Sequence, residues 1–428
     1  MDARSRAADL LALVPAGAVP FVFLHVRYQP GLTIGPAHAY VSDFAIALTV
    51  LAALTAGVRF GFAPLLRPRV LWYVGGAFLL FLGASCFWRP IEAPTTHLVT
   101  FAKFVEYALL TPSLVLLFRR REHVRRFLIV FTAWCVAASG WGALQFLGVV
   151  KEFEGFRPGQ REVSFLGIYD FAVFAGATLA IGLAGVLLAE RGKLVPVAVV
   201  AGGVGVTLAA SVFSYGAQLL AAGAVALVAY RARTATAKRY AVVAAVLVLV
   251  GAGVGVLRGG DISNYLSFLG VQPTPKSAKS HIETGPQRTM LSYIGLRIWE
   301  DHPWLGVGFE RSANRYQPYL AAAKREFPNQ PPGAFPSAAH PWGVQDFWIQ
   351  LLSDTGVVGF ALGVATFATA LLLALRAPPR VNWFKLVAAG WILVAAGTWL
   401  GEGIVAGIPL EAVTWLGFGL AATVGGLE

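Results

Sequence analysis

Runs of about 20 apolar residues recur along almost the whole chain and are separated by short polar connections. A transmembrane helix needs an apolar stretch of this length. The pattern therefore predicts an all-α, polytopic membrane protein with about twelve transmembrane helices. The predicted spans are residues 9–26, 41–58, 70–87, 98–118, 127–149, 168–189, 194–211, 213–230, 240–257, 356–375, 384–401 and 404–426.

Two of these assignments have an alternative. The division of residues 194–230 into two spans depends only on the polar residues between Ser211 and Ser214. The first apolar run follows Arg4 and Arg6 and contains a small-residue stretch at 16–18, as a signal peptide does. We interpret that run as an uncleaved first helix, with a signal peptide as the alternative.

Positive charge in the short connections alternates along the chain. Lys and Arg gather after the second, fourth, sixth, eighth and tenth predicted spans, and the other connections are poorer in them. Because cytoplasmic loops carry an excess of Lys and Arg, the alternation predicts that both termini are cytoplasmic. We interpret the densest cluster, Arg119 to Arg126, as a topology anchor beside anionic headgroups rather than a catalytic patch.

One long segment, residues 258–345, lacks the apolar runs and is rich in Pro, Gly, Lys and Arg. The alternation puts it outside the cytoplasm, where topology does not require its positive charge. An anionic ligand and a solvated loop with scattered charge both explain that charge. The predicted organisation is residues 1–257 with helices 1–9, an extracytoplasmic loop domain at 258–345, and residues 346–428 with helices 10–12.

The loop domain is predicted to be partly helical. Apolar residues at three- and four-residue spacing predict a helix over Gly285 to Glu300, and His302-Pro303 ends it because a residue before proline disfavours the helical region. The proline-rich stretch 327–341 is expected to be extended. Helical spacing then resumes at Val344 to Thr355 and runs into the tenth span.

Composition narrows the class of protein. Of the 428 residues, 57% are hydrophobic and 13% are charged, whereas soluble domains carry about 25% charged residues. This excludes an ordinary soluble enzyme and a disordered chain. Membrane topology and an anionic ligand both explain the net charge of +12, so we expect no nucleic-acid partner. The chain has no Walker A, HExxH, GxSxG or zinc-type Cys/His spacing.

Two segments resemble the O-antigen ligase and O-antigen polymerase superfamily. The first contains Arg288 and the stretch 303–309, Pro-Trp-Leu-Gly-Val-Gly-Phe; the second contains Gln345-Asp346 and the Gly-x-x-Gly pattern at 356–359. That family typically has a loop arginine, a Pro-Leu-Leu-Gly-Val-Gly stretch, and His-Asn nine residues before Gly-x-x-Gly at the tenth span. Its helix number and its large outer loop between spans 9 and 10 are also similar.

The chain departs from this pattern at functional positions. Gln345 stands where the family has its catalytic His, and Asp346 stands where it has Asn. An amide cannot act as a base near neutral pH. The alternatives for the catalytic base are His340, through a displaced loop, and Asp346. A third alternative is a reaction that needs no strong base. Gln345 is then expected to contact sugar. Tyr215 stands where many members have an arginine implicated in diphosphate binding.

The resemblance implies transfer of a glycan from a polyprenyl-diphosphate donor to an acceptor hydroxyl, at the outer face of the bacterial cytoplasmic membrane. Expulsion of a diphosphate needs cations, and arginine binds phosphate oxygens through two parallel hydrogen bonds. The candidate donor-binding residues are Arg288, Arg161, Arg311, Arg89, Lys103 and Tyr215. The alternative role of Arg288 is a salt bridge with Glu283 or Glu300, and the alternative role of Lys103 is pairing with Glu106.

The predicted function is thus a metal-independent membrane glycosyltransferase of the ligase or polymerase type, without a cofactor. Its predicted partners are the lipid-linked donor, a glycan or glycolipid acceptor, and membrane lipids. A transporter or flippase is the first alternative, and it would show a polar path and repeated halves. A non-catalytic binder of lipid-linked glycans is the second, because the family His is missing.

Overall fold

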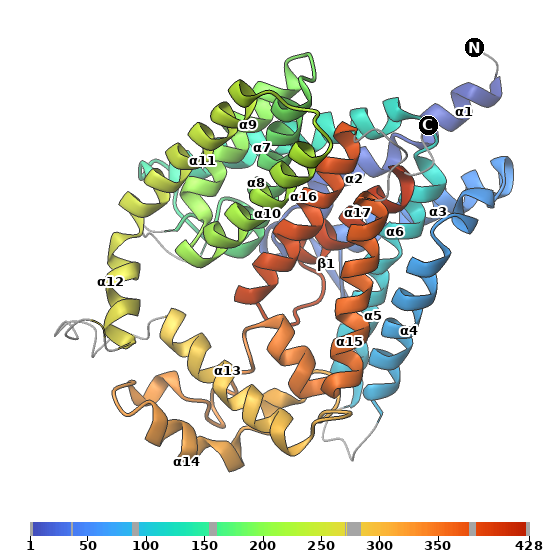
Figure 1. Cartoon of the computed structure of the whole chain (residues 1–428). Coiled ribbons are helices and arrows are strands. Elements are labelled where there is room, and N and C mark those ends of the chain that lie inside the picture. The colour runs from blue at the N-terminus through green and yellow to red at the C-terminus, as the bar shows by residue number, and fades with distance from the viewer. Residues whose placement is uncertain are drawn as a thin grey trace.

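The computed structural model describes residues 3–35, 37–87, 94–153, 161–269, 271, 284–375 and 382–424. Helices dominate this part of the chain (Figure 1). They are α1 (Ala3–Leu11), α2 (Val14–Val22), α3 (Val41–Phe60), α4 (Arg69–Ser85), α5 (Pro94–Ala108), α6 (Leu110–Leu117), α7 (Arg121–Phe146), α8 (Ile168–Leu188), α9 (Leu194–Ala209), α10 (Val212–Arg231), α11 (Ala237–Leu257), α12 (Gly259–Phe268), α13 (Thr284–Asp301), α14 (Gln317–Glu326), α15 (Phe347–Leu375), α16 (Trp383–Thr398) and α17 (Pro409–Val424).

Short elements complete the description. Strands β1 (Gly31–Ile34) and β2 (Ala37–Tyr40) form an antiparallel hairpin before α3, so the fold is all-α apart from this one hairpin in the described residues. The single-turn 3-10 helices are η1 (Val26–Tyr28), η2 (Ala63–Leu66), η4 (Ser312–Asn314), η5 (Pro332–Ala334) and η6 (Trp399–Gly401).

The predicted polytopic membrane class agrees with the structure. Nine helical segments of the described chain are long and apolar enough to cross a membrane. Three shorter apolar helices, α4, α9 and α17, occupy the positions of the remaining predicted spans. The exact count of twelve spans stays a prediction.

Several boundaries differ from the sequence-based ones. The predicted span 9–26 is two short helices, α1 and α2, and ends at Val22. Helix α7 begins at Arg121, so most of the basic cluster lies in its first turns. The break inside 194–230 is where the serines indicated it, because Ser211 caps α10 by accepting a hydrogen bond from the Ser214 amide.

Helix α8 lies at the centre of the bundle. In its most apolar window 83% of residues are buried, against 17% for α11, which faces outward. Small residues allow α9 to approach α8 closely: a Cβ at Gly202 would lie 2.4 Å from the Leu179 nitrogen, and one at Gly182 would lie 2.7 Å from the Val199 nitrogen. Such close contact between small residues is typical of helix packing in membranes.

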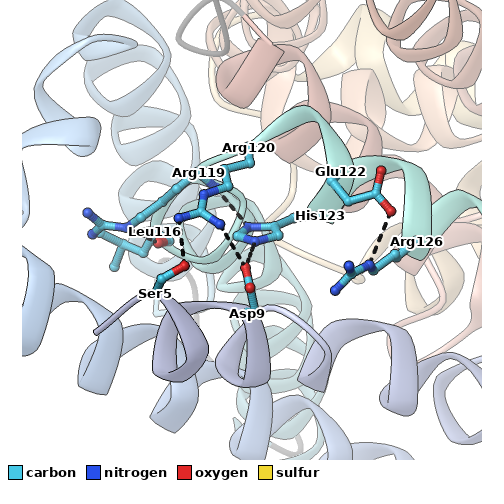
Figure 2. Close-up of polar contacts among 8 residues, drawn as sticks. All are labelled: Ser5, Asp9, Leu116, Arg119, Arg120, Glu122, His123 and Arg126. Carbon is cyan, nitrogen blue, oxygen red and sulfur yellow. Dashed lines mark hydrogen bonds and ion pairs between the residues drawn. The ribbon is translucent and has the colours of Figure 1, made fainter. Parts of the chain in front are cut away.

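The basic cluster joins α1 to the start of α7 (Figure 2), and it also contacts the end of α3. His123 Nε2 lies 2.8 Å from Asp9 Oδ1, and Arg120 Nη1 lies 3.3 Å from the same oxygen. The Arg119 amide donates to His123 Nδ1, so His123 donates to Asp9 through Nε2. The Arg119 guanidinium donates to the Gly61 carbonyl beyond α3 (2.8 Å). These contacts support a structural role for the cluster.

The described residues from α13 to the start of α15 form a lobe at the opposite end of the molecule from the cluster. In Figure 1, α1 lies at the upper right and α13 and α14 lie at the bottom. The predicted helix 285–300 is α13, and it packs with α14 over a small apolar core of the lobe's own. That core is formed by Met290, Leu291, Ile294, Ile298, Val307, Tyr316, Ala323, Ala334 and Phe335. The proline-rich stretch 327–341 is irregular and contains η5 rather than a strand.

Candidate functional site

The two motif segments, residues 303–308 and 353–358, exchange main-chain hydrogen bonds at a break in α15. In a continuous helix the amides of 357 and 358 would donate to the carbonyls of 353 and 354. Here each of these groups finds its partner in the other segment. The bonds are Val357 N–H to Pro303 O (2.8 Å), Val358 N–H to Trp304 O (3.3 Å), Val307 N–H to Ser353 O (3.1 Å) and Gly308 N–H to Asp354 O (2.7 Å).

Glycines make this exchange possible. Gly356 has φ 64° and ψ −168°, which breaks the helix, and Gly306 has φ 62°. A Cβ on Gly356 would lie 2.2 Å from the Trp304 carbonyl carbon, and one on Gly306 would lie 2.3 Å from the Asp354 carbonyl carbon. The motif glycines are therefore required for the close approach of the two backbones.

The buried Asp354 side chain fastens the chain that follows this turn. Its Oδ2 accepts a hydrogen bond from the Glu310 amide (2.9 Å), and its Oδ1 accepts one from the Ser312 amide (2.9 Å). Gln350 also donates to Oδ2 (3.3 Å). The lobe is thereby tied to the first turns of α15, directly after the motif pair Gln345-Asp346.

Arg288, on the first turns of α13, contacts three elements of the bundle. Its Nε donates to Gln345 Oε1 (3.1 Å), which lies just before α15. Its Nη2 lies 3.8 Å from Glu402 Oε2, between η6 and α17. Its guanidinium carbon lies 4.4 Å from the centre of the Tyr169 ring on α8. Of the two alternative ion-pair partners, Glu300 pairs with Arg297 (2.7 Å), and Glu283 lies outside the described residues.

Arg161 lies beside the same tyrosine. Its guanidinium carbon is 4.8 Å from the Tyr169 ring centre, and its Nη1 is 3.5 Å from the Tyr169 hydroxyl. Its Nε donates to the Ala209 carbonyl at the end of α9 (2.8 Å). Its Nη2 is buried and has no hydrogen-bond partner among the described residues. Arg161 and Arg288, here the arginine pair, therefore present two guanidinium groups at one aromatic ring.

The loop after η6 holds Glu402 beside Gln345. The Ile404 amide donates to Gln350 Oε1 (2.6 Å), and a Cβ on Gly403 would lie 2.6 Å from the Val344 carbonyl oxygen. Burial raises the pKa of the Glu402 carboxyl above its ordinary value, while Arg288, Arg161 and the Gly403 amide oppose that rise. We call Arg161, Tyr169, Arg288, Gln345 and Glu402 the arginine site.

Asp346 caps α15. Its Oδ1 accepts hydrogen bonds from the amides of Trp348 (3.0 Å) and Ile349 (3.1 Å). Burial raises the pKa of Asp346, and these amides together with Arg288 oppose the rise. A carboxylate at a helix N-terminus also favours the helix dipole. Asp346 thus has the structural role of a helix cap, and its role as a base stays a prediction.

His340 lies in an exposed turn of the lobe. Ser337 and His340 exchange main-chain hydrogen bonds (2.9 and 3.1 Å), and the imidazole stacks on Trp342 with ring centres 5.8 Å apart. Within the described chain it has no hydrogen bond, ion pair or ring contact with Arg288 or Gln345. The structure therefore does not bring His340 into the arginine site.

Two other candidate cations lie in other contacts. Arg311 is buried, and its Nη2 donates to the Cys86 carbonyl at the end of α4 (2.6 Å). Lys103 pairs with Asp43 of α3 (2.6 Å) and lies over the Tyr40 ring, instead of pairing with Glu106 as the alternative interpretation expected. Their roles in donor binding stay predictions.

Tyr215 is not in the arginine site either. The Tyr215 hydroxyl donates to the Leu247 carbonyl, and the ring packs against Gly251, so Tyr215 joins α10 to α11. Arg89 lies outside the described residues. The arginine site thus unites Arg161, Arg288 and Gln345 of the predicted set, with Asp346 next in the chain.

Tyr169 and Glu402 were not predicted as site residues. Tyr169 lies between Ile168 and Asp170 at the start of α8, and a tyrosine in such a place has no distinctive sequence signal. Glu402 carries a signal in the sequence, because a carboxylate within an apolar stretch is costly and tends to be functional. Only the fold brings it to Arg288.

In the described chain, no three His, Cys, Asp or Glu side chains gather closely enough to hold a metal ion. The expectation of metal-independent chemistry stays a prediction.

Comparison with known proteins agrees with the motifs. Residues 196–364 match a protein family model described as O-antigen ligase. The matched segment contains Arg288, Gln345, Asp346 and both motif glycines, whereas Arg161 and Glu402 lie outside it. No curated protein matches the chain. The match over residues 196–364 supports the resemblance to the O-antigen ligase and polymerase superfamily and a membrane ligase or polymerase type of function.

Proposed function

We propose that the protein is a membrane glycosyltransferase that moves a glycan from a polyprenyl-diphosphate donor to a hydroxyl of a glycan or glycolipid acceptor. The single observation that carries the proposal is the arginine pair at Tyr169, with Gln345 of the family motif bonded to one of its members. Two fixed guanidinium groups match the phosphate oxygens of such a donor. The reaction is proposed to occur at the outer face of the bacterial inner membrane.

The chemistry of the leaving group supports this assignment. When the bond between the anomeric carbon and the diphosphate oxygen breaks, the diphosphate gains negative charge. Cations held in advance where that charge develops stabilise the transition state more than the bound ground state. In the arginine site Arg288 and Arg161 are held by Gln345, Tyr169 and the Ala209 carbonyl, so little reorganisation accompanies the reaction.

The test uses purified protein in liposomes with a polyprenyl-diphosphate oligosaccharide, a panel of acceptors and EDTA. Release of polyprenyl diphosphate is measured. We expect acceptor-dependent release by the wild type and a fall of about 100-fold or more in Arg288→Ala. Arg288→Lys should recover part of the rate, because lysine keeps the charge but loses the planar fork.

Arg297→Ala is the matched control, because Arg297 is exposed on the same helix, pairs with Glu300 at the surface and otherwise lies over the Tyr293 ring of its own helix. Release in Arg288→Ala at the control rate would overturn the donor role of Arg288. Donor binding without release for every acceptor would overturn the transferase assignment and favour a non-catalytic binder. The glutamine at position 345 is the sequence feature that favours this alternative. Loss of release on addition of EDTA would overturn the expectation of metal independence.

A further inference from the structure

The arginine site has a glutamine where a base is needed. Gln345 holds the position of the family His, and its Oε1 accepts a hydrogen bond from Arg288 Nε (3.1 Å). An amide does not take up a proton near neutral pH. His340 lies in the exposed turn 337–340, and the Oδ1 of Asp346 accepts two amides of α15. Because His340 and Asp346 are engaged in these contacts, another carboxylate of the arginine site is a further candidate proton acceptor for the acceptor hydroxyl.

Glu402 meets the geometric requirements. Its Oε2 lies 3.8 Å from Arg288 Nη2, while Nε of the same guanidinium is bonded to Gln345, so one arginine spans both side chains. The charged groups that act on it are Arg288 from α13 and Arg161 from the segment before α8, and its carboxylate acts on Asp170 of α8. Asp170 is itself engaged, because its Oδ1 accepts the Leu410 amide (2.9 Å). The Glu402 side chain keeps 17% of its surface exposed, so solvent or a ligand reaches it.

We propose that Glu402 is the general base that replaces the missing histidine and accepts the proton of the acceptor hydroxyl. This inference rests on the proposed function. The acceptor oxygen forms a bond to the anomeric carbon, and the bond from that carbon to the diphosphate oxygen breaks. The electron pair of the broken bond goes to the diphosphate, beside the arginine pair. The hydroxyl proton goes to the Glu402 carboxylate and then to solvent.

The electrostatics of the site suit this task. Burial raises the pKa of Glu402 above its ordinary value, which makes its carboxylate a stronger base than an exposed glutamate. The two arginines limit the rise, so the carboxyl still ionises readily. The same Arg288 then stabilises both the ionised base and the departing diphosphate.

The test compares turnover with donor binding in three variants. Glu402→Gln is expected to lower the rate of polyprenyl diphosphate release by about 100- to 10,000-fold. Its affinity for the polyprenyl-diphosphate oligosaccharide should stay unchanged or increase, because a negative charge beside Arg288 is removed. Gln345→His combined with Glu402→Gln is expected to recover turnover, since it places an imidazole at the family position. Glu300→Gln, an exposed carboxylate on α13, is the matched control.

The pH profile separates a base from a merely positioning residue. Because only the carboxylate accepts a proton, wild-type turnover should fall as the pH drops through the pKa of Glu402, above the ordinary glutamate value of about 4.3. The residual rate of Glu402→Gln should lack this acid limb. Control-level turnover in Glu402→Gln, or equal losses of donor binding and turnover, would overturn the inference. A wild type that releases no polyprenyl diphosphate overturns the proposed function instead.

Discussion

At the scale of single residues, the side chains of the arginine site contact one another, in addition to the substrate contacts proposed for them. Arg288 is bonded to Gln345 and lies near Glu402 and Tyr169, so a change in any of these partners also moves the guanidinium. Asp346 has a separate structural task as the cap of α15. Stability and turnover must therefore be measured together in every variant of this site.

The cap predicts a difference between two substitutions of Asp346. Asp346→Ala should lower the free energy of unfolding by about 1 kcal/mol, because the amides of Trp348 and Ile349 lose their acceptor. Asp346→Asn should lower the free energy of unfolding by only a few tenths of that amount, since asparagine caps helices equally well. Thermal unfolding in detergent measures both. Equal destabilisation by the two variants would contradict the capping role.

At the scale of elements, the break in α15 joins the lobe to the bundle. The exchange between residues 303–308 and 353–358 replaces helical hydrogen bonds by contacts between two motifs that are distant in the chain. It holds the end of α13 close to the start of α15, so the distance between Arg288 and Gln345 depends on it. We therefore interpret the Gly-x-x-Gly motif as a packing element rather than a source of catalytic groups.

This exchange predicts that Gly356 tolerates no side chain. Gly356→Ala should destabilise the protein by more than about 1 kcal/mol, because φ is 64° and the new Cβ would lie 2.2 Å from the Trp304 carbonyl carbon. Gly255→Ala in α11 is the control, since a Cβ there meets nothing within 4 Å. Unfolding temperatures in detergent compare them. Equal stability of both variants would show that the break does not require glycine.

At the scale of the whole molecule, helix α1, which the basic cluster contacts, and the lobe lie at opposite ends of the bundle (Figure 1). The positive-inside rule predicts that the cluster faces the cytoplasm. The lobe and the arginine site beside it then face outward, where the proposed donor is expected. Orientation is therefore a property of the entire chain.

Orientation is testable with single engineered cysteines, because the native Cys86 and Cys135 are both buried. Ala339→Cys in the exposed turn of the lobe should react with a membrane-impermeant maleimide in intact spheroplasts. Thr236→Cys, exposed between α10 and α11, should react only after permeabilisation. The reverse labelling pattern would contradict the predicted topology.

The sequence by itself predicted the membrane class, the helix positions and the superfamily. Apolar runs report on helices directly, because each span must be apolar along its length and satisfy its own backbone hydrogen bonds. The lobe helix was predicted at 285–300 and spans Thr284–Asp301. The motif residues Arg288 and Gln345 were identified from the resemblance to the family motifs.

Only the tertiary structure decided which charged groups meet. The sequence offered Glu283 and Glu300 as alternative ion-pair partners of Arg288, and Arg288 lies beside Glu402, which is remote in the sequence. Lys103 was given Glu106 as a local partner, and it pairs with Asp43. Local spacing describes neighbours on one helix, whereas these contacts follow from how helices pack against one another. The arginine site is a product of that packing, since its residues come from four separate segments of the chain.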